Sequence, residues 1–269
     1  MSAAEPVPGR FPIDHGVVDV RQDLDCETGF ELRVDGVLSS YVDLADPEHL
    51  DFEYVRWIAG VLESIVPPGT PVDALHLGGA GCTLPRWLAH VRPGSGSTVV
   101  EYDGALVRFI RSTFAALDWT GVDLVEGEAF AVAVASPPAA WDVVVRDAFG
   151  GGDGDPVVPE PLRSRQFAAA VHHTLRPGGC YVANLTDRPP LLQARREAAT
   201  LLGVFAHVAV VTEPGILRGR RYGNLLLVAG DAELPIAAIA RRVGADAVRA
   251  SVVVGERLAG FVGGASPYR

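Results

Sequence analysis

Short β-type runs alternate with segments of helical period along most of the chain. Residues 74–77 are apolar except for His76, residues 84–91 show a helical pattern and residues 98–100 are mostly β-branched, which predicts one βαβ unit. The alternation continues with helical patterns at 104–117, 128–135, 160–175 and 190–202 and strand patterns at 123–126, 141–146, 180–185, 207–212 and 224–229, before two short terminal helices. This order predicts an α/β fold with a doubly wound, mostly parallel sheet.

The first quarter of the chain has a different pattern. Three strand patterns, at 17–23, 30–34 and 37–43, are separated by turn signals such as Asp35-Gly36, and they predict a small antiparallel β-appendage. A helix is predicted to begin at Asp46-Pro47, to carry an apolar face and to end before Pro67.

These patterns give an expected domain organisation. Residues 1–12 are rich in proline and glycine and are expected to form a disordered leader. The hairpin-and-helix appendage is expected over residues 13–68, and the nucleoside-binding α/β domain over 69–269.

A glycine-dense turn follows the first strand of the βαβ unit. Gly78, Gly79 and Gly81 let the backbone approach a ligand closely, and Glu101 ends the next strand about 20 residues later, where an acid can accept both hydroxyls of a ribose. Neither a full G-x-G-x-x-G pattern nor a G-x-x-x-x-G-K-[ST] pattern is present, which weighs against dinucleotides and P-loop triphosphates. The turn therefore predicts a nucleoside without a pyrophosphate, such as S-adenosylmethionine; the alternative is an ordinary βα turn.

Acidic residues lie at three predicted strand ends. Ligands of a doubly wound sheet bind at the carboxyl ends of its strands, near the reversal of strand order. Glu128 could accept from an exocyclic adenine amine or cap its own helix, and Asp147 could meet a substrate amine or a sulfonium, or cap the following turn. The residues assigned to the nucleoside site are Gly78, Gly79, Gly81, Glu101, Asp103, Glu128, Ala129 and Asp147.

Composition narrows the classes of partner. The net charge is −10, with 23 basic residues dispersed among 33 acidic ones, which argues against a nucleic-acid partner. The chain contains no lysine, so chemistry through a lysine Schiff base, including pyridoxal phosphate attachment, is excluded.

Metal and membrane signals are also missing from the sequence. The three cysteines are far apart, and the adjacent His172 and His173 would point about 100° apart on a helix, so no metal is expected. No uninterrupted apolar stretch of about 18 residues exists, and the first residues lack the features of a signal peptide. We expect a cytoplasmic protein that does not bind a membrane.

Several segments together resemble a known family. They are RVDGVLSSYVDL, DFEYVRW, LHLGGAGCTLPRWL, TVVEYD, EGEAFAV, WDVVVRDAFGG, LRPGGCYVANLTD and NLLLVA, and they span about residues 17 to 229. They are similar to the spermidine synthase-like aminopropyltransferases, nearest to the branch often found fused to, or beside, major-facilitator transporter segments. The resemblance implies a seven-stranded sheet of the class I methyltransferase type, decarboxylated S-adenosylmethionine as donor and a diamine such as putrescine as acceptor. It also implies an oligomer, for example a homodimer, since members are often dimers or tetramers.

The resemblance implies roles for individual residues. Glu101 falls on the ribose-binding acid, Glu128 on the adenine-side acid, Tyr54 on the substrate-pocket tyrosine and Asp147 on the first aspartate of the D-[ST]-x-D-P gate loop.

The chain departs from the family pattern near these residues. Ser39 replaces a glutamine, Val55-Arg56 replace His-Glu, and the glycine turn lacks the family's acid. Gly150 occupies the position of the second gate-loop aspartate, which is the family's proton acceptor.

The last departure leaves three functions open. An alkylammonium with a pKa of about 10 must lose a proton before its nitrogen attacks the carbon next to a sulfonium. Asp147, Asp153 or Asp155 could accept that proton, which would allow an aminopropyltransferase with a rebuilt acceptor site. A methyltransferase on a small molecule needs only donor binding and a different pocket. The third hypothesis is a non-catalytic relative that binds a nucleoside or a partner, or retains the fold alone.

Overall fold

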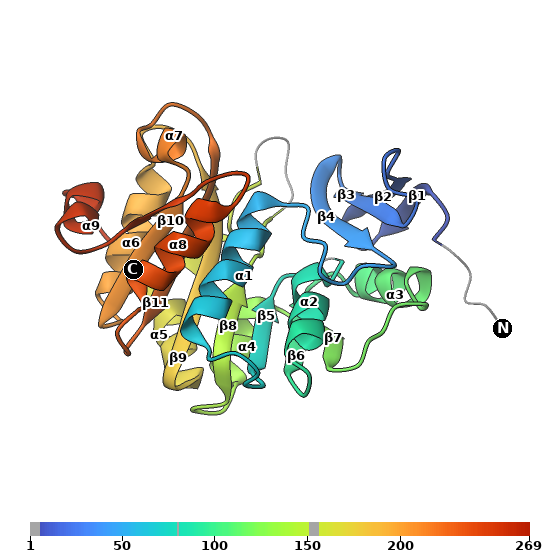
Figure 1. Ribbon diagram of the computed structural model, residues 1–269, viewed down its shortest axis with the longest axis horizontal. Helices are drawn as coiled ribbons and strands as arrows, with labels where there is room; N and C mark the ends of the chain where they lie inside the picture. Colours follow the sequence, from blue (N-terminus) through green and yellow to red (C-terminus); the bar gives the residue numbers. More distant parts are fainter. Residues whose placement is uncertain (1–5, 80, 151–155) are drawn as a thin grey trace.

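Two sheets of different size make up the protein. A computed structural model describes residues 6–79, 81–150 and 156–269 (Figure 1). Within these ranges the chain forms a four-stranded antiparallel sheet and an eight-stranded mixed sheet. Figure 1 shows the small sheet at one end of the molecule, beside α2 and α3.

The secondary-structure elements have the following bounds. The small sheet contains β1 (Gly9–Ile13), β2 (Gly16–Gln22), β3 (Gly29–Val34) and β4 (Val37–Asp43). The large sheet contains β5 (Asp73–Leu77), β6 (Gly96–Glu101), β7 (Val122–Glu126), β8 (Trp141–Arg146), β9 (Leu175–Asp187), β10 (His207–Thr212), β11 (Gly223–Gly230) and β12 (Ser251–Val253). The helices are α1 (Glu53–Ile65), α2 (Thr83–Val91), α3 (Gly104–Thr113), α4 (Ala129–Ala135), the 3₁₀ helix η1 (Glu160–Arg163), α5 (Arg165–Thr174), α6 (Leu192–Leu202), α7 (Pro214–Leu217), α8 (Ile236–Ala245) and α9 (Gly255–Val262).

The topology of the large sheet is doubly wound, as predicted. Its strand order is β12-β10-β11-β9-β8-β5-β6-β7, and the pairs from β9 to β7 are parallel. The order reverses at β5, because β6 follows on one side of it and β8 is added on the other. In the described residues the sheet has eight strands instead of the seven implied by the family resemblance, since the short β12 pairs with β10 at the edge.

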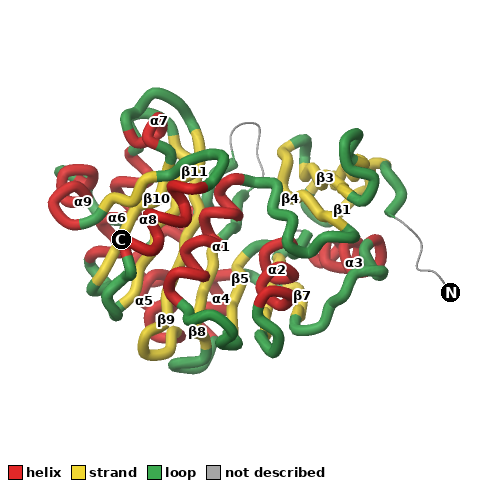
Figure 2. Tube along the Cα trace, in the orientation of Figure 1, coloured by secondary structure: helices red, strands yellow, loops and turns green. Residues whose placement is uncertain are grey.

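Helices cover both faces of the large sheet (Figure 2). Alternate residues of each strand face opposite sides: Val143 and Val145 pack with α1, α2 and α8, whereas Val144 packs with α4, α5 and α6. Because both faces are buried, the central strands are continuous apolar runs instead of alternating ones. None of the helices in the described parts of the chain is both long and apolar enough to cross a membrane.

The small antiparallel sheet is confirmed, with one more strand than predicted. Asp35 and Gly36 both have positive φ, 49° and 83°, as a type I′ hairpin requires. The leader predicted over residues 1–12 is wrong at its end, because Gly9–Ile13 forms β1 and pairs with β2. Phe11 of β1 packs 4.9 Å, between ring centroids, from Phe109 of α3. That long-range contact orders a segment whose composition suggested a leader.

The predicted start of the first helix is also wrong. The helix begins at Glu53, and Asp46 instead accepts the backbone N–H of Glu48 in a turn at 2.8 Å. Helix α1 covers the large sheet together with α2 and α8, so it packs in the α/β layer, although the pattern grouped it with the appendage.

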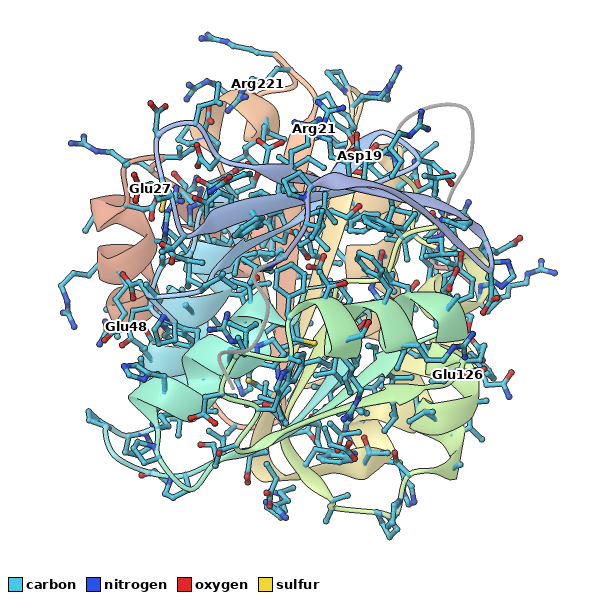
Figure 3. All side chains as sticks on the ribbon, turned by 90° about the vertical axis from the view of Figure 1, so that its right-hand side faces the viewer. Asp19, Arg21, Glu27, Glu48, Glu126 and Arg221 are labelled. Carbon is cyan, nitrogen blue, oxygen red and sulfur yellow. The ribbon has the colours of Figure 1, made fainter. Side chains whose placement is uncertain are left out.

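The small sheet lies across α2 and α3 and covers one end of the large sheet (Figure 3). Val18 and Leu32 from the sheet pack with Val99 of β6 and Leu106 of α3 in one apolar cluster. Its other side is polar, and Asp19 and Arg21 form an ion pair there with a nitrogen–oxygen distance of 2.7 Å. The sheet is therefore fixed to the α/β layer by its inner face.

His76 is a buried ionisable residue in the middle of β5. Its side chain is 2% exposed, and Nε2 lies 3.3 Å from the Ser97 hydroxyl of β6. Burial lowers the pKa of His76 from 6.5 to about 3, because the imidazolium form loses its hydration.

We predict that His76 makes the protein sensitive to mild acid. Unfolded chains bind a proton at this residue below about pH 6.5, whereas the folded protein does so only near pH 3. Between these values the free energy of unfolding should fall by about 1.4 kcal/mol per pH unit from this residue. His76→Leu should remove that slope, measured by urea unfolding between pH 7.5 and pH 5. Replacement of the exposed His173 by Gln should keep it, and an unchanged slope in His76→Leu would contradict the assignment.

Candidate active site

Three of the predicted residues meet where the strand order reverses. Gly78 follows β5, Glu101 ends β6 and Asp147 follows β8, and β5 pairs in parallel with both neighbours. The backbone N–H of Asp147 donates to the carbonyl of Leu77 at 2.9 Å, and that of Gly78 donates to Val100 at 2.9 Å. The candidate site is therefore the rim formed by the carboxyl ends of β5, β6 and β8.

The glycines of the turn are required by the protein's own packing. Gly78 has φ +83°, and a Cβ there would lie 2.4 Å from the carbonyl oxygen of Asp147. A Cβ at Gly79 would lie 2.4 Å from Val99 Cγ1, and one at Gly81 would lie 2.7 Å from Val42 Cγ2 of β4. The turn thus allows β8 on one side, and the small sheet on the other, to approach the start of α2.

The two acids at the end of β6 have different surroundings. Glu101 is largely buried and accepts the backbone N–H of Asp103 at 3.2 Å. The carboxylate of Asp103 accepts from Leu106 N at 2.8 Å, which caps α3, and from His15 N at 2.7 Å, which holds the β1–β2 turn. Because backbone groups occupy both oxygens of Asp103, we leave this residue out of the proposed ligand-binding set.

Glu128 caps α4. Its carboxylate accepts from Phe130 N at 3.0 Å and from Ala131 N at 2.7 Å, as an acid at a helix start does. Of the two roles open for Glu128, the structure thus displays capping; its side chain is exposed, and a contact with adenine stays a prediction. Ala129 is buried in the first turn of the same helix.

Asp147 receives two hydrogen bonds from other elements. The Asn184 side-chain amide on β9 donates to its Oδ1 at 2.7 Å, and the hydroxyl of Tyr54 on α1 donates to the same carboxylate. Burial raises the pKa of Asp147, while the bonds from Asn184 and Tyr54 and the charge of Arg146 act against the rise. Burial and the negative charge of Asp147 also raise the pKa of Tyr54 well above its usual value, so Tyr54 is a neutral donor.

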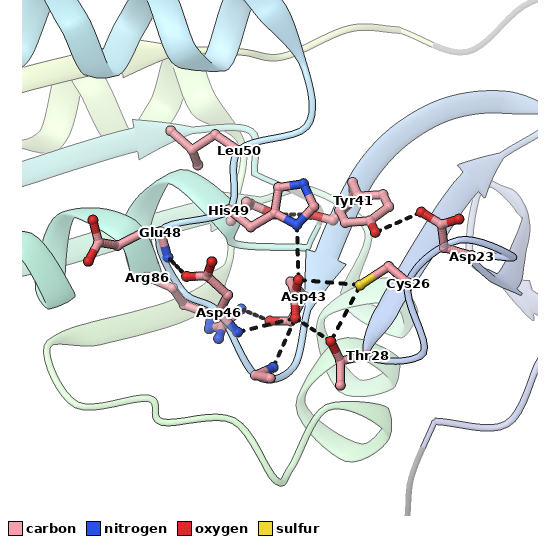
Figure 4. A network of polar contacts seen from close by, with 12 residues as sticks. Asp23, Cys26, Thr28, Tyr41, Asp43, Asp46, Glu48, His49, Leu50 and Arg86 are labelled. Atoms are coloured by element: carbon pink, nitrogen blue, oxygen red, sulfur yellow. Dashed lines mark hydrogen bonds and ion pairs between the residues drawn. The ribbon is translucent and has the colours of Figure 1, made fainter.

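A polar network on Asp43 fixes the segment that carries Tyr54 into the site (Figure 4). Asp43 ends β4, and its carboxylate accepts from the Thr28 hydroxyl at 2.7 Å and pairs with His49 Nδ1 at 2.9 Å. It also accepts from the backbone of Ala45 at 3.0 Å. Burial acts to raise the pKa of Asp43, but the bonds from His49 and Thr28 lower it below its usual value. The linker into α1, and with it Tyr54, is therefore tied to the small sheet.

Asp153 and Asp155 of the predicted gate loop lie outside the described residues. Gly150 forms an isolated bridge, donating from its backbone to the carbonyl of Val157 at 2.8 Å. Among the described loop residues, only Asp147 brings a carboxylate to the Tyr54 hydroxyl.

Two polar residues of the rim, Asn184 and Arg146, were not predicted from the sequence, although each is a polar residue in an apolar strand pattern. Asn184 is the one amide in the buried strand segment CYVANL, and Arg146 is a charged residue ending an apolar run. Both are fully buried. A polar residue inside a buried strand needs a hydrogen-bond partner, but the sequence does not say which one.

Two surface hollows lined by described residues lie away from this rim. One hollow of about 360 Å³ lies between α6, α9 and the start of β10, and a second of about 360 Å³ lies at the amino ends of β5 and β6. Neither is lined by Glu101, Tyr54 or Asp147. Topology and convergent polar groups identify the rim instead. No group of three histidine, cysteine or acidic residues within the described ranges is placed to hold a metal ion.

Relatives of this chain are found among solved structures. A scan against models of protein families finds no match, and a search of curated proteins finds none. Among solved structures, a probable spermidine synthase from Corynebacterium glutamicum has a TM-score of 0.90 and 33% sequence identity, covering 98% of this chain and 96% of that one. The chain belongs to the spermidine synthase-like family.

More distant structures share the fold of this spermidine synthase-like chain. Spermidine synthase from Thermotoga maritima has a TM-score of 0.65 at 16% identity, covering 91% of this chain and 80% of that one. Human Methyltransferase-like protein 13 in complex with SAH has a TM-score of 0.57 at 19% identity, with coverages of 71% and 90%. The α/β methyltransferase-type fold predicted from the sequence is thus confirmed.

We predict that Gly78→Ala destabilises this spermidine synthase-like protein far more than its backbone angle alone requires. Gly178 is a matched control, because it has the same φ of +83° and nothing within 4 Å of a Cβ. Gly178→Ala should cost about 1 kcal/mol of unfolding free energy, and Gly78→Ala about 3 kcal/mol, because its methyl group also meets the backbone of Asp147. Urea unfolding measures both, and equal losses would show that the close approach has no energetic weight.

Proposed function

We propose that this chain binds a sulfonium nucleoside across the rim and transfers its aminopropyl group to a small amine. In this proposal Glu101 accepts the ribose hydroxyls and the backbone at Gly78, Gly79 and Gly81 faces the nucleoside. The observation that carries it is the meeting of Tyr54 and Asp147 beside the glycine turn. The similarity of the whole chain to a probable spermidine synthase supports it, as does a solved spermidine synthase in complex with the transition-state analogue AdoDATO, which shares the fold (TM-score 0.63, 16% identity, coverages of 91% and 80%).

The residues at the rim suit the chemistry of this transfer. The lone pair of the amine attacks the methylene carbon bonded to sulfur, the carbon–sulfur bond breaks, and its electrons neutralise the sulfonium. The attacking nitrogen loses a proton to a carboxylate, for which Asp147 is the described candidate and Asp153 the candidate in the gate loop. A carboxylate whose pKa is raised by burial accepts a proton more readily at neutral pH, so the environment of Asp147 favours this role.

Methyl transfer from intact S-adenosylmethionine is the second candidate function. It is favoured by Gly150, which places no carboxylate at the position of the family's proton acceptor. The same rim could bind either donor, since the two differ only in a carboxylate far from the ribose. We also infer a homodimer and a place in the transporter-associated branch, both from the sequence resemblance.

The choice of donor tests the proposal. A donor present at 100 times its dissociation constant adds about 2.7 kcal/mol to stability, which is about 5–10 °C in the melting temperature of a protein of this size. We expect that rise with decarboxylated S-adenosylmethionine and a smaller one with the intact donor, measured by scanning fluorimetry. The reverse preference would support methyl transfer, and no shift with either would contradict both. Mass spectrometry with a panel of diamines then tests turnover.

Variants at Glu101 test how the donor is held. Glu101→Gln should abolish most of the donor-induced rise, because the amide cannot accept both ribose hydroxyls as a carboxylate does. Glu48→Gln is the control, since Glu48 is exposed on the linker between β4 and α1 and should keep the full rise. A full rise in Glu101→Gln would show that the ribose assignment is wrong.

A further inference from the structure

Asn184 links Asp147 to a second asparagine on the neighbouring strand. Its side chain is fully buried in β9, where Nδ2 donates to Asp147 Oδ1 at 2.7 Å. Its Oδ1 accepts from Asn224 Nδ2 on β11 at 3.0 Å. The two asparagines and Asp147 thus form a chain of side-chain hydrogen bonds that runs from the end of β8 across β9 to β11.

The order of donors in this chain of hydrogen bonds determines which protonation state of the Asp147 carboxyl group it favours. A side-chain amide has one acceptor oxygen and one donor nitrogen. Because Asn224 donates to the oxygen of Asn184, the nitrogen of Asn184 faces Asp147, and Asp147 must accept. An ionised carboxylate accepts at either oxygen, whereas a protonated one accepts with only part of its capacity. Asn224 therefore favours the anion of Asp147 without contacting it.

A buried ion pair fixes the backbone beneath Asn184. Arg146 is completely buried. It donates to the carbonyl of Asn184 at 2.9 Å and to that of Leu162 at 2.9 Å, and it pairs with the buried Glu197 at 2.6 Å. Among the residues that the structure describes, Arg146 Nε, Glu197 Oε2 and the Tyr181 hydroxyl have no hydrogen-bond partner. A buried ion pair whose polar atoms lack hydrogen-bond partners lowers the free energy of unfolding, so stability alone does not explain the presence of this pair.

We propose that Asn184, oriented by Asn224 and by the Arg146–Glu197 pair, is a positioning residue that keeps the Asp147 side chain ionised and fixes its direction. Its effect on catalysis rests on the proposed function, but its effect on the charge of Asp147 does not.

The other charged groups around Asp147 act in known directions. Tyr54 on α1 donates to the carboxylate, and Glu53 acts on Tyr54 through its charge. The positive charge of Arg146 on β8 stabilises the anion, and Glu197 on α6 offsets it as its ion-pair partner. With these two charges opposed, the hydrogen bonds from Asn184 and Tyr54 are the main support for the anion against burial.

The titration of Asp147 tests the proposal. The protein is labelled with ¹³C at aspartate carboxyl groups, and the resonance of Asp147 is assigned by its loss in Asp147→Asn. In Asn184→Ala the titration midpoint should rise by about one pH unit, because a hydrogen bond to a charged group is worth about 1.5 kcal/mol or more. Thr212→Val is the control: it removes a hydroxyl that donates to the backbone carbonyl of Asn224 at 2.8 Å and should leave the midpoint unchanged.

Asn224→Asp tests the direction of the chain. A carboxylate at 224 accepts from Asn184, turns its oxygen towards Asp147 and should also raise the midpoint. In the Asn184→Ala background, Asn224→Asp should then raise the titration midpoint of Asp147 little further. A purely Coulombic effect of the new charge on the midpoint would persist in that background. An unchanged midpoint in Asn184→Ala, or full additivity in the double variant, would overturn the proposal. If the alanine variant does not fold, Asn184→Ser, which retains a shorter donor, should raise the midpoint less than Asn224→Asp, and the opposite order would overturn the proposal.

Turnover separates this inference from the proposed function. If the wild-type protein transfers an aminopropyl group to putrescine, Asn184→Ala should move the acidic limb of the pH profile of kcat/KM to higher pH, together with the titration midpoint. At pH values below that limb, kcat/KM should fall about tenfold for each pH unit of the shift. A limb that stays in place while the midpoint moves would show that Asp147 is not the group that turnover requires. If the wild type turns over no diamine, the proposed function fails, and the titration still decides whether Asn184 holds the charge of Asp147.

Discussion

The backbone after β8 approaches the turn after β5 so closely that no side chain fits between them. At Gly78 a single added carbon would lie 2.4 Å from the carbonyl oxygen of Asp147. This contact exists because β5 has parallel neighbours on both sides. The segments that follow β5 and β8 therefore leave the sheet at the same edge, next to each other. The place of Asp147 in the rim depends on this contact, since it puts this acidic residue from one strand beside the glycine turn of the next.

Asp147 is held between two opposed effects. Burial disfavours its charge, whereas hydrogen bonds from α1 and β9 and the charge of Arg146 favour it. Such a balance is typical of residues that exchange protons or bind cations, because a small change in surroundings changes the charge. The residues that maintain it, Tyr54, Asn184 and Arg146, come from three separate elements, and Asn184 and Arg146 are completely buried.

The small sheet holds parts of the candidate site in place. It packs on α3 and β6, and Ser40 of β4 accepts the backbone N–H of Gly81 at 2.9 Å. Asp43 then fixes the linker that leads to Tyr54. The chain thus uses the sheet as a support that places one side of the glycine turn and one side-chain hydroxyl relative to Asp147.

The sequence by itself determined the α/β class, the glycine turn, the hairpin at Asp35-Gly36 and the acids at the strand ends, because these depend on period, on turn chemistry and on order along the chain. Only the tertiary structure decided that β1 is ordered and that α1 begins at Glu53. It also decided that the Asp103 carboxylate accepts hydrogen bonds from backbone N–H groups, and that Asn184 and Tyr54 both donate to Asp147. These features depend on contacts between residues far apart in sequence, and a pattern within one segment contains no information about the partner on another strand.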